Sequence, residues 1–258
     1  MAIDEALLTL VGQGASPPTV RFYTWDRPWV SLGSGQQAGE IDRAACAARG
    51  WGIVRRASGG TAVLHAEQVA YSITLPAANP LWVGDLAASY RRFAEPLRAA
   101  FARLGVAADL AAPDANAEFQ RNAPALARRI CFAALGPYEH LVSGKKLVGN
   151  SQVRRRHANA QHGVIQVSGN QTDLIDVLSD TTAADRAALR AFLGSHIGSL
   201  APDAPAVSLS AICDAITAAF GEGFDVEWER RGLSEDEIAL TDALGNEKYG
   251  ADEWTLRR

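Results

Sequence analysis

Residues 52–75 read GIVRRASGGTAVLHAEQVAYSITL, and this stretch decides the fold class. Apolar and β-branched residues at its start and end are typical of strands, and a Gly-Gly pair separates them. A short apolar run around residues 62–65 lies between the pair and the last strand. The stretch therefore predicts strand, glycine loop, short strand and strand, which is the core of a β-sheet.

The segments before and after this stretch continue the sheet and add helices to it. Residues 19–25 (TVRFYTW) and 29–33 (WVSLG) predict two further strands with a turn between them. Three helices are expected: an amphipathic one over residues 2–12 that Gly14 ends, a short one over 42–50 closed by Gly50, and a longer one over 83–104.

The second half of the chain predicts one hairpin followed by helices. Residues 138–156 and 161–169 are expected to be its strands, with HANA near its tip, whereas residues 111–129 lack a clean period and predict a surface loop. Later segments predict a helix from after Gly169 to about 178, helices over 183–193 and 208–220, a short strand over 224–228, and a final helix over 234–250 that opens with a capping box.

Together these segments predict an α+β fold, in which helices flank a central mixed or antiparallel β-sheet. We expect a single domain over residues 1–258, since no low-complexity linker divides the chain. Its helical C-terminal portion, about residues 170–258, can form a small lobe.

Composition and charge exclude several classes of function. The net charge of −4 argues against bulk nucleic-acid binding, and three scattered cysteines provide neither a disulfide framework nor a metal site. The N-terminus has no signal-peptide pattern, and no stretch approaches the roughly 20 apolar residues that span a bilayer. We therefore expect a soluble, cytoplasmic protein that binds no metal, membrane or nucleic acid.

The loop RRASGGTAVLH (residues 55–65) is the first candidate site. Glycines after a strand allow backbone N–H groups to approach a ligand closely, and Arg55 and Arg56 can pair with a phosphate. The alternative is a β-turn with two solvated arginines. The spacing matches neither a P-loop nor a dinucleotide fingerprint.

Cys131 is the second candidate. Cys46 and Cys213 lie in Ala-rich helical patterns and are expected to be small buried side chains. Cys131 instead follows Arg128 and Arg129, and nearby positive charge favours the reactive thiolate. Cys131 is therefore either a nucleophile or an incidental buried cysteine.

Basic residues after Cys131 supply further candidates. One side chain of the Lys145–Lys146 pair must face opposite to the other on a strand, and a partly desolvated lysine can orient an acyl carbonyl or take up a proton. The run 154–156 (RRR) is either a docking patch for an acidic protein or a solvated hairpin end. His162 either points into a cleft or is a satisfied strand histidine, whereas no role is expected for His157.

Several motifs occur in one order that is specific in combination. They are RFYTW…SLG, VRRASGGTAVLH…YSI, ICF…YE…V.GKKLVGNSQ.R…QHG.I and the terminal KYGADEWTLRR. In this order the chain resembles the lipoate-protein ligase A/octanoyltransferase superfamily, which is related to biotin protein ligases. It is most similar to the cysteine-dependent octanoyltransferases of the Gram-positive type, over nearly its whole length.

The resemblance implies a fold like the biotin/lipoate protein ligase catalytic domain, with a fatty-acyl tunnel beneath the glycine loop. It implies that Cys131 accepts the acyl group and that Lys146 is the family's catalytic lysine. We expect the loop between Arg121 and Cys131 to move to bring the two together. The acyl-binding residues that it implies are Arg55, Arg56, Ser58, Gly59, Gly60, Thr61, His65, Tyr71, Gly149, Gln152, His162 and Gly163.

The implied activity is transfer of an octanoyl group from acyl carrier protein, through Cys131, to a lysine of a lipoyl-domain protein. The acceptor would be the glycine cleavage H protein or a 2-oxoacid dehydrogenase E2, and the enzyme a monomer without a cofactor. HAEQVAYS (65–72) and Gln152 differ from the ligase pattern, which favours transfer from a thioester. The alternatives are an ATP- and Mg-dependent lipoate-protein ligase, an amidotransferase between lipoyl-domain proteins, and a non-catalytic acyl-binding protein.

Overall fold

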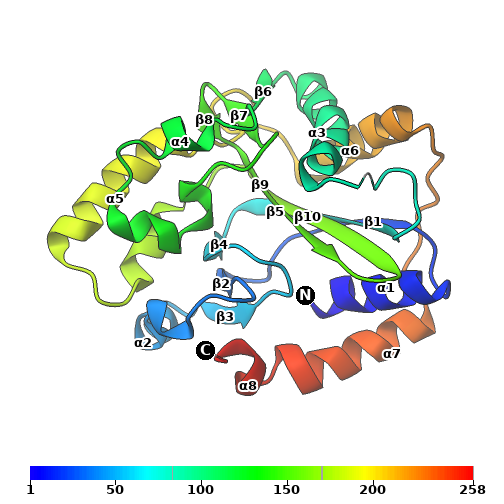
Figure 1. Cartoon of the computed structure of the whole chain (residues 1–258), viewed down its shortest axis with the longest axis horizontal. Coiled ribbons are helices and arrows are strands. Elements are labelled where there is room, and N and C mark those ends of the chain that lie inside the picture. Colours follow the sequence, from blue (N-terminus) through cyan, green and yellow to red (C-terminus); the bar gives the residue numbers. More distant parts are fainter. Residues whose placement is uncertain (83, 170, 258) are drawn as a thin grey trace.

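A four-stranded antiparallel sheet forms the centre of the protein (Figure 1). The structure is a computed structural model that describes residues 1–82, 84–169 and 171–257. The strands, in spatial order, are β1 (Thr19–Tyr23), β5 (Gln68–Pro76), β10 (Ala158–Gln166) and β9 (Val148–Arg154). The predicted α+β class with mixed and antiparallel sheets is confirmed.

Two smaller sheets complete the β-structure. In the first, β2 (Trp29–Leu32) pairs in parallel with β3 (Gly52–Arg55) and antiparallel with β4 (Val63–His65), so this sheet is mixed. The second is antiparallel and contains β6 (Ala108–Leu110), β7 (His140–Val142) and β8 (Lys145–Lys146).

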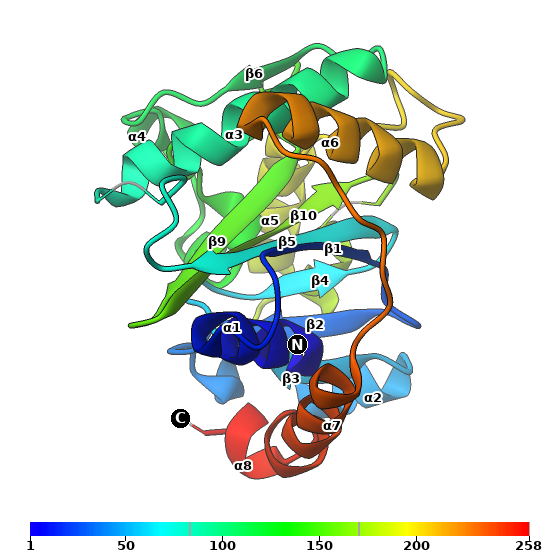
Figure 2. The same cartoon turned by 90° about the vertical axis from the view of Figure 1, so that its right-hand side faces the viewer.

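Helices cover both faces of the central sheet (Figure 2). Two of them, α3 (Leu86–Arg103) and α6 (Leu209–Phe224), pack together over one face, and α1 (Ala2–Gln13) covers the other. Strand β5 serves both faces because its side chains alternate. Its Tyr71 and Ile73 are fully buried in the core beneath α3 and α6, whereas Ser72 points to α1 and donates to Asp4 at 2.8 Å.

The helices that follow residue 170 pack on three different parts of the molecule. The core of the mixed sheet is covered by α5 (Ala183–His196) and the 3-10 turn Thr172–Val177, and α2 (Arg43–Ala48) packs there too. Helix α6 instead packs on α3, and α7 (Glu235–Leu244) packs on α1. The π-helical turn Gly245–Tyr249 leads to α8 (Asp252–Thr255) beside β3. Among the described residues, these helices do not form a lobe of their own.

The helix ends follow the sequence closely. Gly14 ends α1 in a left-handed conformation, and the predicted capping box of α7 is present between Ser234 and Glu237. Helix α3 begins at Leu86, with Asp85 as its N-cap, later than predicted. Residues 83 and 170, which the predictions included, lie outside the described residues. Over the residues that the structure describes, no helix has both the length and the hydropathy of a membrane span.

The predicted first strand of the hairpin, residues 138–156, is wrong as one element. Ser143 and Gly144 both have positive φ, 49° and 74°, and such a pair makes a tight two-residue hairpin turn. This turn joins β7 to β8 in a separate sheet, so of the three strands in this range only β9 pairs with β10. The break determines the direction in which Lys146 points.

Two other predictions are wrong for local reasons. Residues 224–228 form no strand, because α6 continues to Phe224 and Asp225 ends it with φ 54°. Residues 111–129 are not simply a loop, because they contain α4 (Asn116–Phe119) and the 3-10 turn Ala125–Arg129. Phe119 anchors α4 by edge contacts with the rings of Phe192 and His196 on α5.

Candidate active site

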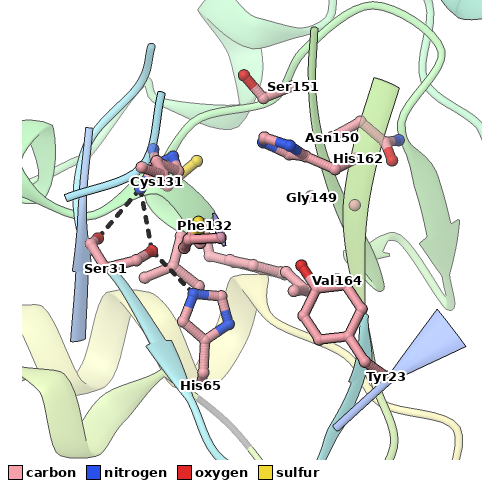
Figure 3. Close-up of a pocket in the computed structure, with 14 residues that line it drawn as sticks. Tyr23, Ser31, His65, Cys131, Phe132, Gly149, Asn150, Ser151, His162 and Val164 are labelled. Carbon is pink, nitrogen blue, oxygen red and sulfur yellow. Dashed lines mark hydrogen bonds between the residues drawn. The ribbon is translucent and has the colours of Figure 1, made fainter. Parts of the chain in front are cut away.

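A partly open pocket lies between the glycine loop and strands β9 and β10 (Figure 3). The Cys131 sulfur and the His162 ring project toward each other across it. Other lining residues are Met1, Tyr23, Ser31, Arg56, Val63, His65, Phe132, Gly149, Asn150, Ser151, Gly163 and Val164.

Arg56 organises the glycine loop. Its buried guanidinium donates to the carbonyl oxygens of Ser31 (3.0 Å), Gly59 (2.7 Å) and Thr61 (2.8 Å), so the loop is wrapped around this side chain. Burial lowers the pKa of Arg56, and negative charge at Cys131 acts in the opposite direction. Gly59 and Thr61 thus serve through their backbone.

Gly60 is the point at which Arg56 and Cys131 meet. It has φ +86°, and an added Cβ would lie 2.8 Å from an Arg56 nitrogen and 3.7 Å from Cys131 Sγ. A side chain at this position would therefore occupy the space between the thiol and the guanidinium. Arg128 and Arg129 were expected to supply the positive charge beside the thiol, but in the structure the nearby cation is Arg56.

Residues 130–136, which contain the 3-10 turn Cys131–Ala133 and are called the Cys131 turn below, are docked on the glycine loop. The Cys131 N–H donates to the Ala62 carbonyl at 2.9 Å, and the thiol is half-buried. The thiol thus already lies at the glycine loop, whereas the expected movement of the loop between Arg121 and Cys131, which would bring the thiol and Lys146 together, stays a prediction. The neighbouring arginines point elsewhere, because Arg128 donates to Ala125 and Arg129 to Ser179.

Lys146 lies behind the Cys131 turn, outside the residues that line the pocket. Its ammonium forms a 2.6 Å ion pair with Glu139 and donates to the carbonyls of Ala134 (2.7 Å) and Cys131 (3.4 Å). Only 2% of the Lys146 side chain and 5% of the Glu139 side chain are exposed. The structure thus brings Lys146 to the backbone of Cys131 and gives it a carboxylate partner.

Two histidines belong to the pocket, and each binds a serine. His65 Nε2 lies 2.8 Å from Ser31 Oγ, and its ring stacks on Trp25. His162 Nε2 lies 2.7 Å from Ser58 Oγ, which ties the glycine loop to β10. Burial lowers the pKa of His65 to about 3, and the positive charge of Arg56 adds to this shift. Burial also lowers the pKa of His162 to about 4, although the negative charge of Asp4 opposes the shift. Both rings are neutral near pH 7.

Buried histidines predict acid-labile folding. Burial lowers the pKa of His65 to about 3 and of His140 to about 4, whereas the unfolded chain binds these protons near pH 6.5. Their contribution to stability is complete above pH 6.5 and is lost as the pH falls toward 4. We expect the free energy of unfolding, measured by urea denaturation, to fall by about 1.4 kcal/mol per pH unit for each ring.

The control for this prediction is the exposed His157. His140→Gln should make the loss between pH 6 and 4 shallower, because glutamine does not titrate, whereas His157→Ala should leave it unchanged. Equal slopes in His140→Gln and the unmodified protein would contradict the prediction.

Tyr71 and Gly163 shape the wall of the pocket from behind. The Tyr71 hydroxyl donates to Asn150 Oδ1 at 2.5 Å, and burial raises the pKa of this tyrosine. Gly163 lies against both side chains, since an added Cβ would overlap the Asn150 amide oxygen and lie 2.6 Å from the Tyr71 ring. Gly149 similarly allows Phe132 to approach, at 3.0 Å from a Cβ added there.

Seven predicted acyl-binding residues are not among those that line the pocket: Arg55, Ser58, Gly59, Gly60, Thr61, Tyr71 and Gln152. The side chains of Arg55 and Gln152 bond to other elements. Arg55 is fully buried and donates to the carbonyls of Gly33 and Gln36, both at 2.7 Å, and to that of Thr255 at 3.1 Å. Gln152 bonds Gln161 and Ser89 beneath α3. Both side chains therefore support the fold, because strand alternation and the loop geometry direct them to neighbouring elements.

Sequence reasoning did not single out Glu139, Ser31 or Phe132. Glu139 is part of the YE motif and directly follows Tyr138, but its partner Lys146 meets it only through the β7–β8 hairpin. Ser31 alternates with the buried Val30 and Leu32 of β2, which was a usable signal.

Comparisons with known proteins agree with this architecture. Residues 1–221 match the family model of the lipoyl protein ligase A/B catalytic domain. The chain is 38% identical to the octanoyltransferase LipM of Kyrpidia tusciae over 260 residues, covering all of this chain and 94% of the relative. The LipM of Moorella thermoacetica is also 38% identical, with 100% and 93% covered.

A solved structure shares the fold at lower identity. The bi-partite lipoate protein ligase of Thermoplasma acidophilum superposes with a TM-score of 0.79 at 20% identity, covering 100% of this chain and 92% of that chain. This likeness shows the fold alone, whereas the family model and the curated relatives cover most or all of the sequence. The chain therefore belongs to the lipoyl protein ligase A/B catalytic-domain family.

Proposed function

We propose that this protein is an octanoyltransferase that moves an octanoyl group from acyl carrier protein to a lysine of a lipoyl-domain protein through an acyl-enzyme at Cys131. The observation that carries the proposal is the Cys131 thiol, half-buried in the pocket and meeting Arg56 over Gly60. The names of the similar octanoyltransferases support the same reaction class.

The first step is thioester exchange. The Cys131 sulfur attacks the carbonyl carbon of the octanoyl thioester, a new C–S bond forms, and the old C–S bond breaks. The proton lost by Cys131 ends on the departing carrier thiol. Arg56 stabilises the negative sulfur, and the neutral His162 ring, which faces Cys131, can pass the proton.

Lys146 assists at the acyl oxygen by exchanging one partner. All three of its ammonium hydrogens have acceptors in the resting structure, and the contact with the Cys131 carbonyl is the longest at 3.4 Å. Turning that N–H toward the pocket would stabilise the oxyanion of the tetrahedral intermediate.

The second step is aminolysis of the acyl-enzyme. The neutral ε-amine of the acceptor lysine attacks the carbonyl carbon, a C–N bond forms, and Cys131 leaves as a thiolate that recovers the proton of the amine. The thioester provides the driving force, so the proposed reaction needs neither ATP nor a metal. Apolar residues such as Val63, Phe132 and Val164 line the pocket, and burying the acyl chain contributes roughly 5 kcal/mol to binding.

A comparison of donors tests this function. We expect transfer to a lipoyl-domain protein from octanoyl carrier protein without ATP, measured by intact-protein mass spectrometry. Attachment only from free lipoate with ATP and Mg²⁺ would identify a ligase instead. Transfer only from an octanoylated lipoyl-domain protein would identify an amidotransferase, and acyl binding without any transfer a binding protein.

A further inference from the structure

The buried carboxylate of Glu139, paired with Lys146, is the strongest feature that the proposed reaction leaves unused. Glu139 Oε2 accepts from Lys146 Nζ at 2.6 Å and from the Gly136 N–H at 2.7 Å, and Oε1 accepts from the Asn150 N–H at 3.0 Å. Among the described residues, one carboxylate thus connects the end of the Cys131 turn, the β8 lysine and β9.

Both ends of this connection reach the pocket. Lys146 holds the turn through the carbonyls of Cys131 and Ala134, and its ammonium lies 5.1 Å from the centre of the Phe132 ring. On the other side, Asn150 lines the pocket, and its Oδ1 accepts a hydrogen bond from the Tyr71 hydroxyl. Glu139 therefore connects the turn that carries the thiol with this wall of the pocket.

We infer that Glu139 is a positioning residue for acyl transfer, which acts through Lys146 to hold the turn that carries Cys131. Two charges removed from water need each other and further hydrogen bonds, and here the carboxylate and the ammonium have both. Without the carboxylate, Lys146 would lose the charged partner that helps to keep its ammonium beside the carbonyls of Cys131 and Ala134. This inference rests on the proposed function, because it assigns Glu139 a part in that reaction.

A double-mutant cycle separates this role from a general structural one. Glu139→Gln, Lys146→Met and the double variant are compared in two measurements: single-turnover acylation of Cys131 by octanoyl carrier protein, and amide hydrogen exchange of residues 130–136. The second measurement needs no acyl donor. Glu118→Gln removes the same charge from an exposed position on α4 and is the matched control.

We expect Glu139→Gln to slow acylation at least about tenfold and to speed exchange in the turn. In the Lys146→Met background, the same substitution should change each rate less than about twofold, because the two residues act as a unit. Glu118→Gln should match the unmodified protein. If Glu139→Gln does not fold, Glu139→Asp, which keeps the charge on a shorter side chain, takes its place in the cycle.

Two results would overturn the inference. One is an acylation rate within about twofold of the unmodified protein in Glu139→Gln, whatever happens to exchange. The other is an equal slowing of acylation with and without Lys146, which would make Glu139 a structural residue. If the unmodified protein forms no acyl-enzyme, the proposed function fails, independently of Glu139. In that case the exchange measurement alone tests the coupling, and equal changes in exchange rate with and without Lys146 would refute it.

Discussion

Cys131→Ala is expected to abolish the octanoyl adduct and to lower the rate of transfer to the lipoyl-domain protein by at least about 10³-fold. The thiol is the only side-chain nucleophile of its kind among the described residues that line the pocket, and it meets Arg56 over Gly60. Intact-protein mass spectrometry after mixing with octanoyl carrier protein measures the adduct directly. The substitution removes only the sulfur of a half-buried side chain, so we expect the fold to persist.

The other two cysteines provide matched controls. Cys46 is buried on α2, and Cys213 is partly buried on α6, so both lie on elements that do not line the pocket. Cys46→Ala and Cys213→Ala should each keep the adduct and the transfer rate. Transfer at the normal rate in Cys131→Ala would refute the acyl-enzyme.

Gly33→Ala is expected to have the second-largest effect, because it displaces the glycine loop through the backbone. A Cβ at Gly33 would overlap the carbonyl oxygen of Gly60, the residue beneath the Cys131 sulfur. No side-chain rotation can relieve this overlap, so the loop must move or the fold must loosen. We expect a loss of roughly 1–3 kcal/mol in the free energy of unfolding and at least about tenfold slower acylation.

Gly35→Ala is the matched control, because Gly35 lies two residues after Gly33 in the loop that follows β2. A Cβ there meets no atom within 4 Å, so stability and acylation should both stay close to those of the unmodified protein. Equal effects of Gly33→Ala and Gly35→Ala on stability and acylation would show that the loop after β2 needs backbone flexibility, and not the close contact between Gly33 and Gly60.

The sequence was most informative where local rules decide the structure. The strands around residues 52–75, the glycine that ends α1 and the capping box of α7 depend on neighbours within a few residues, and each was predicted. The hairpin turn at Ser143–Gly144 was missed because a serine at positive φ gives no clear signal. That turn moves Lys146 from a continuous strand to the back of the Cys131 turn.

The sequence predicted which residues gather at the site better than it predicted where their side chains point. The glycine loop, Cys131 and His162 do converge on one pocket, as their order in the motifs implied. Arg55 was expected beside Arg56, yet the two adjacent side chains on a strand point to opposite sides, and only the tertiary structure shows which one enters the pocket. Glu139 could not be paired with Lys146 without the hairpin between them.

The contact of Arg55 with the last helix has a consequence for the order of events during synthesis. Arg55 and Trp254 are 199 positions apart, and each donates to a backbone carbonyl of the other. At roughly 5–20 residues per second, a ribosome needs about 10–40 s to make the intervening chain. The strand that leads into the glycine loop must wait that long for α8, so a nascent chain cannot complete the contacts of Arg55 until Trp254 has emerged.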